Sequence, residues 1–174
     1  GFESVRLVQA AFNNMSLALY TKLGFNVQEP LSAINGPILN ISIPGCKVRS
    51  AGIEDIEECN ELCIKIHGHH RKGDLGDAIH QKTASVVERN GRITGYATQI
   101  GFFGHAVSET NDDLKALIGA AQGFAGPGIL LPTRNSEVMR WCLDNGLKII
   151  QPLSLMSYGP YNVPKGAFLP SIIF

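Results

Sequence analysis

The hydrophobic and polar positions near the start of the chain predict a strand–helix–strand unit. Residues 5–10 form a strand-like run, and residues 12–25 contain a short helix that ends at a glycine. Asn13 or Asn14 is a suitable N-cap, because its side-chain oxygen can accept a hydrogen bond from a free amide of the first turn. Gly24 is expected to close the helix in a left-handed conformation. The expected apolar side of the helix consists of Leu17, Leu19, Tyr20 and Leu23. The parallel strands of such a unit need further strands to form a buried sheet.

The next segment contains the break between two parts of the chain. Residues 29–37 are rich in turn residues, and residues 38–43 alternate well enough to predict a strand. Pro44 and Gly45 then interrupt the pattern, so we place a domain boundary after residue 45.

Residues 46–174 contain a longer series of elements. One predicted helix is amphipathic, and its apolar face consists of Ile56, Cys59, Leu62, Cys63 and Ile66. Asn90 and Gly91 are a strong hairpin signal between two strands, and Thr110 or Asn111 is the expected cap of a later helix. The expected elements are, in order, a strand at 46–50, a helix at 54–66, a short helix at 75–84, strands at 84–89, 92–100 and 104–108, a helix at 112–122, a strand at 129–131, a helix at 133–146, a strand at 147–150 and a last strand at 167–174.

The pattern of the opening unit returns at residues 133–146, with a polar cap, an apolar face and a closing glycine. Aligning the two closing glycines places Asn135 opposite Asn13. The same alignment places Cys142 opposite Tyr20. The chain therefore contains an internal repeat of one supersecondary unit, at a separation typical of a domain rather than of a solenoid.

Composition narrows the classes of protein to which the chain can belong. Its 174 residues suit one domain, or one domain with a piece of another. Fifteen basic residues balance fifteen acidic ones, so no long-range field would attract nucleic acid or an anionic membrane. We find no apolar run long enough to cross a bilayer and no signal-peptide pattern. The four cysteines are therefore expected to be reduced thiols in a cytoplasmic protein. Because Gly1 and Phe2 lead almost directly into a strand, we expect a fragment or a processed product.

The first helix resembles part of a known family. The residues that carry the likeness are Asn13, Tyr20, Gly24 and Phe25. Their spacing resembles the C-terminal half of the GNAT superfamily, the acyl-CoA-dependent N-acetyltransferases, in which a "GF" strand follows the helix. From residue 46 onward the order of elements is similar to a complete GNAT domain. The resemblance implies an α/β (α+β) fold with a mixed central sheet flanked by helices. It implies two parts, with residues 1–45 as the C-terminal strand–helix–strand tail of a first GNAT-like domain and residues 46–174 as a complete, divergent one.

The resemblance also implies acetyl-CoA as co-substrate. GNAT enzymes bind the CoA pyrophosphate at the start of the central helix, where unpaired N–H groups and the positive end of the helix dipole meet. At that place the chain lacks the family's glycines and arginine. Glu109, Asp112 and Asp113 put up to three carboxylates there, which would repel a pyrophosphate. This departure counts against ordinary CoA binding in residues 46–174. The residues implied in acetyl-CoA binding are Ala106, Val107, Thr110, Asn111, Asn135 and Asn13.

The implied reaction is transfer of an acetyl group from acetyl-CoA to an amine of a small molecule or peptide by direct attack. Glu109 or His105 would take the proton of the amine as general base. Cys142 or Tyr20 would protonate the CoA thiolate. A backbone amide near Ala106 or Val107 would polarise the thioester carbonyl. Each of the four side chains also has a structural interpretation, as a buried cysteine, a packed tyrosine or a group at a strand end or helix cap.

Two other functions remain open at this stage. In the first, the chain is a catalytically degenerate GNAT-like module that binds a ligand or dimerises. The carboxylates favour this alternative, whereas Asn135 and the order of elements favour the enzyme. In the second, Cys59, Cys63 and His67 share a helix face and ligate zinc. The cysteines coincide with the apolar face, so we prefer a core position for them and assign no metal site.

The expected partner is an amine substrate, with no nucleic acid and no membrane. The strands within residues 1–45 need partner strands, because an open strand edge promotes association. We expect them to complete their sheet against residues 46–174, or against another chain by exchange, which would produce a homo-oligomer.

Overall fold

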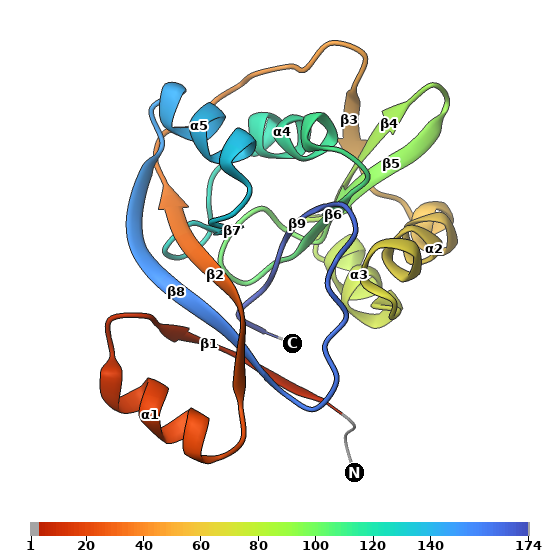
Figure 1. The fold of residues 1–174 in the computed structure, drawn as a ribbon. Helices are drawn as coiled ribbons and strands as arrows, with labels where there is room; N and C mark the ends of the chain where they lie inside the picture. Colours follow the sequence, from red (N-terminus) through yellow and green to blue (C-terminus); the bar gives the residue numbers. More distant parts are fainter. Residues whose placement is uncertain (1–3, 174) are drawn as a thin grey trace.

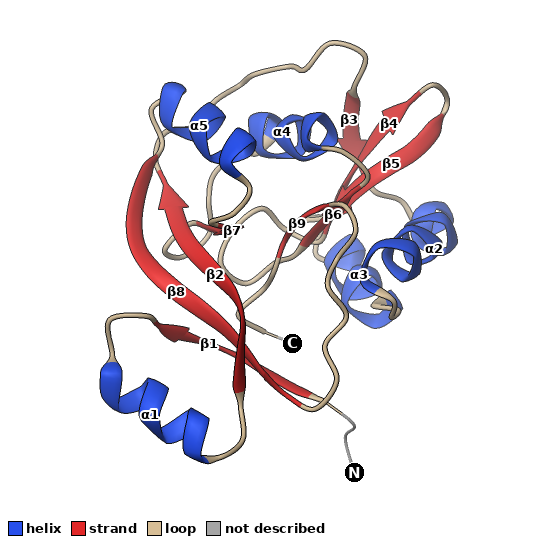
Figure 2. Ribbon diagram, in the orientation of Figure 1, coloured by secondary structure: helices blue, strands red, loops and turns tan. Residues whose placement is uncertain are grey.

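The computed structural model describes residues 4–173, which form two β-sheets with helices packed around them (Figures 1 and 2). The elements are β1 (Val5–Ala10), α1 (Asn14–Lys22), β2 (Asn26–Asn35), β3 (Lys47–Ser50), a 3₁₀ turn (Ile53–Asp55), α2 (Ile56–His67), α3 (Lys72–His80), β4 (Ser85–Arg89), β5 (Arg92–Ala97), β6 (Ala106–Ser108), α4 (Asn111–Ala120), β7 (Ile129–Pro132), α5 (Ser136–Asp144), β8 (Lys148–Tyr158) and β9 (Ala167–Leu169). The expected α/β class is confirmed.

The first sheet joins strands from the two ends of the chain in the order β1–β8–β2–β7. Strand β8 lies between β1 and β2 and is antiparallel to both, so β1 and β2 run parallel to each other without pairing. Val5 pairs with Tyr158 at one end of β1, and Ala10 pairs with Leu153 at the other. Strand β2 pairs with β7 along its second edge. The N-terminal strands thus complete their sheet within the same chain.

The second sheet has the order β3–β4–β5–β6–β9. Strands β4 and β5 form the predicted hairpin, and Asn90 and Gly91 at its turn have φ angles of 53° and 76°. Strand β9 adds an outer edge beside β6, with Ala106 opposite Leu169. Strand β6 is therefore paired along both edges. The pairings between named strands of the described residues are all antiparallel, and these strands form two sheets rather than one mixed sheet.

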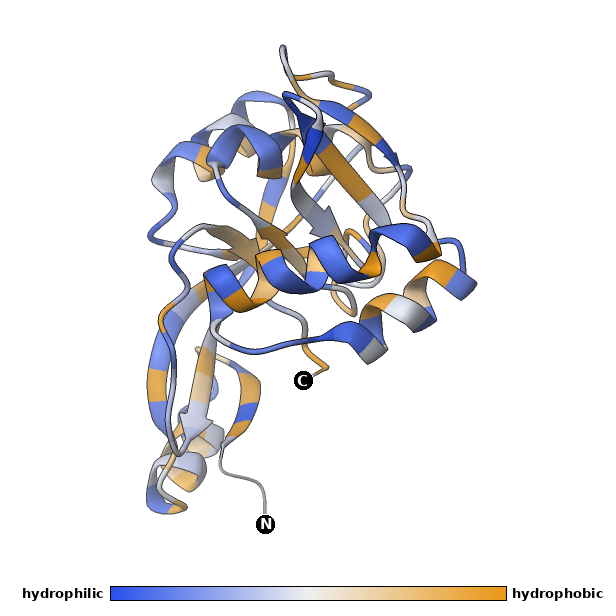
Figure 3. Ribbon diagram, turned by 90° about the vertical axis from the view of Figure 1, so that its right-hand side faces the viewer, coloured by the Kyte–Doolittle hydropathy of each residue, from blue (hydrophilic) through white to orange (hydrophobic). Residues whose placement is uncertain are grey.

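Helices α2 and α3 lie together on one side of the second sheet. Figure 3 views this side and shows hydrophobic and hydrophilic residues alternating along both helices. Four predicted face residues of α2 are buried: Cys59, Leu62, Cys63 and Ile66. They pack in one cluster with β4 and β5, whereas α4, α5 and β7 share another. Helix α4 thereby contacts both the second sheet and α5.

Two predictions for the segment after α1 are wrong. Strand β2 continues through residues 29–35, where turn residues predicted an irregular segment. The sheet accommodates Pro30 because the register shifts just before it, and a bulge tolerates the missing N–H. Residues 38–43 form no strand. Instead the backbone N–H of Ile41 donates to the carbonyl of Gly119 at 3.0 Å, so this segment runs along α4 rather than along a strand.

Helix α1 is capped as predicted but does not have a single apolar side. The Asn13 side chain accepts from the Ser16 amide at 3.0 Å, and Gly24 has a φ of +90°. However, Leu19 and Leu23 are 54% and 57% exposed, and no residue of the helix is fully buried. We call the exposed face the outer stripe of α1; it consists of Phe12, Met15, Leu19 and Leu23. The spacing of apolar residues predicted a helix correctly but assigned two of its leucines to the wrong face.

The C-terminal strands also differ from prediction. The strand predicted at 147–150 begins at Lys148 and continues to Tyr158, so that β8 has 11 residues. Its Pro152 still takes part, because its carbonyl accepts from the Ala11 amide at 3.1 Å. Strand β9 has only three residues and ends where Pro170 follows. The predicted last strand extended to Phe174, which lies outside the described residues.

The two strand–helix–strand units resemble each other locally. Asn135 caps α5 as Asn13 caps α1, and Gly146 has a φ of +87°, close to the +90° of Gly24. That residues 1–45 come from a first GNAT-like domain, with a boundary after residue 45, stays a prediction.

Candidate functional site

The start of α4 is the place where the sequence predicts cofactor binding, and a capping box closes it. Thr110 Oγ1 accepts from the Asp113 amide at 3.3 Å. In return, Asp113 Oδ2 accepts from the Thr110 amide at 3.1 Å. Reciprocal capping of this kind satisfies amides that would otherwise be free to bind an anion. The Asp113 side chain and the Thr110 hydroxyl therefore occupy amide donors that a bound phosphate would otherwise use.

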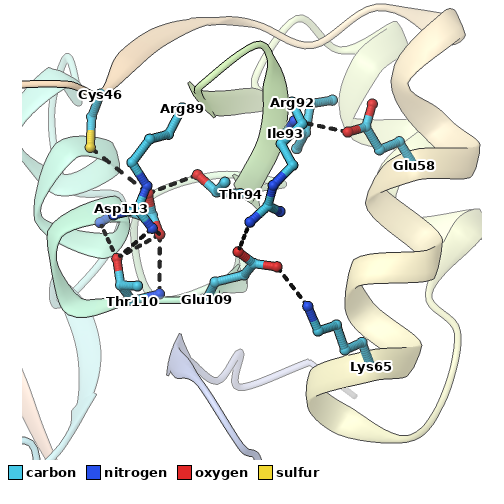
Figure 4. A network of polar contacts seen from close by, with 10 residues as sticks. All are labelled: Cys46, Glu58, Lys65, Arg89, Arg92, Ile93, Thr94, Glu109, Thr110 and Asp113. Carbon is cyan, nitrogen blue, oxygen red and sulfur yellow. Dashed lines mark hydrogen bonds and ion pairs between the residues drawn. The ribbon is translucent and has the colours of Figure 1, made fainter.

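Asp113 is fully buried and anchors a polar network (Figure 4). The guanidinium of Arg89 donates to its Oδ2 at 3.0 Å, and the hydroxyl of Thr94 donates to its Oδ1 at 2.7 Å. Cys46 Sγ lies 3.8 Å from the same Oδ1. Burial, with the Asp113 charge as the next cause, raises the pKa of the Cys46 thiol. This cluster ties β3, β4, β5 and α4 together.

Arg89 and Thr94 were not predicted as partners of Asp113. A signal for Thr94 exists, because it is a polar residue in a strand whose neighbours are apolar, and it is only 1% exposed. Arg89 offers no comparable signal, since an arginine beside a hairpin turn is usually solvated.

The other two carboxylates at this site are also paired with cations. Glu109 accepts from Arg92 at 2.6 Å and from Lys65 at 2.8 Å (Figure 4). The hydrogen bond from Arg92 is the largest cause that lowers the pKa of Glu109 to about 2. Asp112 is exposed and pairs with Lys115 at 3.2 Å. The expected repulsion of a pyrophosphate is thus reduced, but a carboxylate of such low pKa is a weak general base.

Several predicted cofactor residues do meet in space. Glu109, Thr110, Asn111 and Asn135 line one open pocket of about 340 Å³ above the start of α4. The side-chain amide of Asn135 donates to Asn111 Oδ1 at 2.9 Å, and its own oxygen accepts from the amide of Val138. The opposite wall is formed by the segment that leads into β9: Lys165, Gly166, Ala167 and Phe168.

Strand β9 changes the role that β6 can play. The resemblance implies that an amide near Ala106 or Val107 polarises a thioester carbonyl. Here Val107 lies opposite Tyr96 of β5 and opposite Phe168 of β9. A strand paired along both edges has its amides engaged in the two ladders. A thioester could reach these amides only if β9 moved away.

His105 lies buried beneath this region. It is 4% exposed, and its Nε2 is hydrogen-bonded to the Tyr96 hydroxyl at 3.0 Å. Its backbone amide donates to Thr98 Oγ1 at 3.0 Å. Desolvation lowers the pKa of His105 well below its ordinary value, so the imidazole is neutral. It has the protonation state of a base, but both of its ring nitrogens lie within hydrogen-bond distance of hydroxyl groups, those of Tyr96 and Thr98.

The two predicted thiolate acids lie far apart. Cys142 faces the core from α5, is 0% exposed, and burial raises its pKa to about 12. Tyr20 lies on α1, at the opposite end of the first sheet (Figure 2), and is partly exposed. Its ring is edge-on to Phe25 with 5.8 Å between the centroids. Asn13, at the exposed start of the same helix, is the only other predicted site residue in that unit. The structure therefore divides the predicted residues into two groups rather than bringing them together.

The alternative zinc ligands do not form a site. Cys59 and Cys63 are both 0% exposed within the cluster of α2, β4 and β5. Burial raises the pKa of each thiol, that of Cys59 to about 12. Within residues 4–173 no group of three His, Cys, Asp or Glu side chains is arranged to hold a metal ion. The same residues include no helix long and apolar enough to span a membrane.

The chain matches no protein-family model and no curated protein in sequence. Its fold, however, is similar to that of solved structures. A protein of Pyrococcus horikoshii proposed to be an acetyltransferase has a TM-score of 0.68 and 13% identity, over 95% of this chain and 58% of that one. A GCN5-related N-acetyltransferase of Sphaerobacter thermophilus has a TM-score of 0.52 and 12% identity, over 94% and 62%. A GNAT-family acetyltransferase of Colwellia psychrerythraea has a TM-score of 0.54 and 13% identity, over 89% and 65%. The chain thus has the GNAT acetyltransferase fold, and it spans less than two thirds of each of these three proteins.

Proposed function

We propose that this protein takes part in the transfer of an acyl group from acyl-CoA to an amine. We further propose that residues 46–174 serve as a supporting repeat rather than as the acyl-CoA site. The GNAT fold, shared with proteins named as acetyltransferases, supports the class of reaction. The observation that carries the second part is the pairing of β6 with both β5 and β9.

The second sheet does not fit acyl-CoA in the expected way. Its β6 amides are engaged on both edges, and the amides at the start of α4 are capped by Asp113 and Thr110. Cys142, the candidate acid of this half, is fully buried. These features engage the carbonyl-polarising amides and two of the donors that a phosphate would use, and they bury the proton donor, so we assign no chemical step to this half.

The unit β1–α1–β2 fits the remaining roles better. Its Tyr20 is partly exposed, whereas Cys142 at the matching position is not. The first turn of α1 contains no acidic residue, whereas that of α4 contains Asp112 and Asp113. In the proposed reaction an amine nitrogen bonds to the thioester carbon while the carbon–sulfur bond breaks. The amine loses a proton to a base, and the Tyr20 hydroxyl gives a proton to the leaving thiolate.

Paired substitutions test this assignment. Acetyl-CoA binding is measured by calorimetry, and acyl transfer by release of the CoA thiol with a panel of amines. We expect Tyr20→Phe to lower kcat by roughly 10²-fold or more with little change in KM, because only the proton donor is lost. The matched variant Cys142→Ala should leave kcat unchanged. The assignment is refuted if acetyl-CoA binding is lost in Asn135→Ala and retained in Asn13→Ala.

A second function is favoured by the same pairing of β6. If β9 has closed the cofactor groove of this fold permanently, the chain is a ligand-binding or dimerisation module without acyl transfer. The experiment above separates the two functions. Absence of both acetyl-CoA binding and thiol release would support the module and exclude the enzyme.

A further inference from the structure

A second pocket lies at the junction of three segments that are distant in sequence. It has a volume of about 780 Å³ and is open to solvent. The segments are the start of β1, the connection from α2 to α3, and the chain just after β8. A volume of this size accommodates a small organic ligand. None of the residues proposed above for acyl transfer lines it.

The walls of this pocket are rich in positively charged and imidazole side chains. Those that line it are Arg6, His69, His70, Arg71 and Lys72. Asp74 is the carboxylate on the same wall, and it accepts from Arg71 Nε at 2.7 Å. Arg71 also donates to the carbonyl of Ile173 at 3.2 Å, and Lys72 pairs with Glu57. These contacts hold the cationic side chains in place around the opening.

A much smaller space lies beside this pocket. Arg6, His69 and Arg71 line both spaces, and the smaller one, of about 10 Å³, also touches His67, His105 and Tyr161. The guanidinium of Arg6 lies over the Tyr161 ring at 5.2 Å. Cationic and imidazole groups therefore surround the smaller space as well as the pocket.

The lowered pKa values of two histidines are consistent with the same positive charge around the pocket. Desolvation is the first cause that lowers the pKa of His67, to about 3, and the charges of Arg6 and Arg71 lower it further. The same two arginines depress the pKa of His69, again after desolvation. A bound anion would act in the opposite direction on each of these groups.

Two further features of the wall suit an anion. Helix α3 begins at Lys72 without a side-chain cap, so the positive end of its dipole meets the pocket at Lys72 and Gly73. A Cβ built at Gly73 would meet nothing within 4 Å, so the backbone there can be approached closely. Ser4 also lines the pocket, and its Oγ is a buried oxygen without a hydrogen-bond partner among the described residues.

We propose that this pocket binds a small molecule through an oxyanion, either a carboxylate or a phosphate group, held between Arg6, Arg71 and the start of α3. Arginine is suited to both anions because its planar donors match their oxygens. The site depends on the first sheet, since Arg6 reaches it only because β1 pairs with β8. This inference goes beyond acyl transfer and does not rest on it.

The test is a titration of the ¹⁵N-labelled protein at constant ionic strength. Inorganic phosphate is added in one series and acetate in another, and backbone amide shifts are followed by NMR. We expect saturable shifts at Arg6 and at residues 68–74. The stronger of the two series identifies the preferred anion. Arg6→Gln should weaken binding by roughly ten-fold or more, as expected for loss of one charge-assisted contact.

The control is Lys148→Gln, an exposed lysine at the other end of β8, which should leave binding unchanged. The dispersion of the amide spectrum shows whether Arg6→Gln still folds. If it does not, His69→Asn replaces it and should weaken binding through the same pocket. Shifts that never saturate in either series, or equal affinities for wild type, Arg6→Gln and Lys148→Gln, would overturn the proposal.

Discussion

Replacement of Asp113 by asparagine is the sharpest test of the packing at the start of α4. The carboxylate is 0% exposed and accepts from Arg89, Thr94 and the Thr110 amide. Asparagine keeps the shape, but it removes the charge and presents an NH₂ group toward donors. One of these hydrogen bonds must then be lost, and the Arg89 guanidinium loses its counter-ion.

The expected loss of stability can be estimated from these contacts. Removing one partner of a buried ion pair costs about 3–5 kcal/mol. Arg89 keeps 29% side-chain exposure, so water can solvate it partly after the change. We therefore expect a loss of about 3–4 kcal/mol, at the lower end of that range. With a urea m-value of about 2 kcal/mol per molar, this corresponds to a midpoint lower by about 1.5–2 M.

Urea unfolding followed by circular dichroism measures this change. The matched control is Asp112→Asn, because this neighbour is exposed and loses only a surface pair with Lys115. Such pairs are worth about 0–1 kcal/mol. A loss below about 1 kcal/mol for Asp113→Asn, equal to that of the control, would refute the view that the buried carboxylate organises this region.

Three other predictions follow from the described contacts. Glu109→Gln should destabilise the protein at neutral pH. The difference in the free energy of unfolding between wild type and variant should shrink as the pH falls from about 4.5 toward about 2. Over that interval Glu109 becomes protonated in the folded protein, so the stability that its lowered pKa provides is lost. Urea midpoints measured across this pH range test the prediction. Gly128→Ala should cost several kcal/mol in thermal or urea unfolding, since its Cβ would lie 2.0 Å from a backbone oxygen, whereas Gly45→Ala, with open space around it, should cost about 1 kcal/mol. The exposed apolar outer stripe of α1 predicts self-association, which Leu19→Lys should reduce without loss of stability; equal masses of wild type and variant by light scattering would contradict a role for that stripe in association.

Much of the fold could be predicted from local signals. The hairpin at Asn90 and Gly91, the Thr110 cap and the two asparagine-capped helices all follow from short-range chemistry that a sequence shows directly. The errors arose where a distant partner decided the outcome. Residues 38–43 have the alternation of a strand, but α4 occupies the place where a partner strand would need to lie.

The candidate site was less predictable than the fold. Residue type could suggest that Glu109 or Cys142 is reactive. It could not show that Arg92 and Lys65 pair with Glu109, or that Cys142 is buried in the core. A last strand at 167–174 was predicted, but its pairing with β6 was not, because pairing between strands that are distant in sequence leaves no local pattern. The anion pocket needs Arg6 beside Arg71, and only the strand order brings these residues together.

The interleaved strand order of the first sheet affects how this protein folds during synthesis. Strand β1 finds its partner only in β8, at the far end of the chain, and β2 lies between β8 and β7. Contacts of such high sequence separation close a large loop before any stabilisation is gained, which slows folding. During synthesis the edge of β1 that pairs with β8 stays open until the residues up to β8 have been made. Open edges of this kind promote misassembly. The yield of folded protein should therefore depend on how quickly β8 is made and pairs with β1, rather than on the stability of the finished sheet.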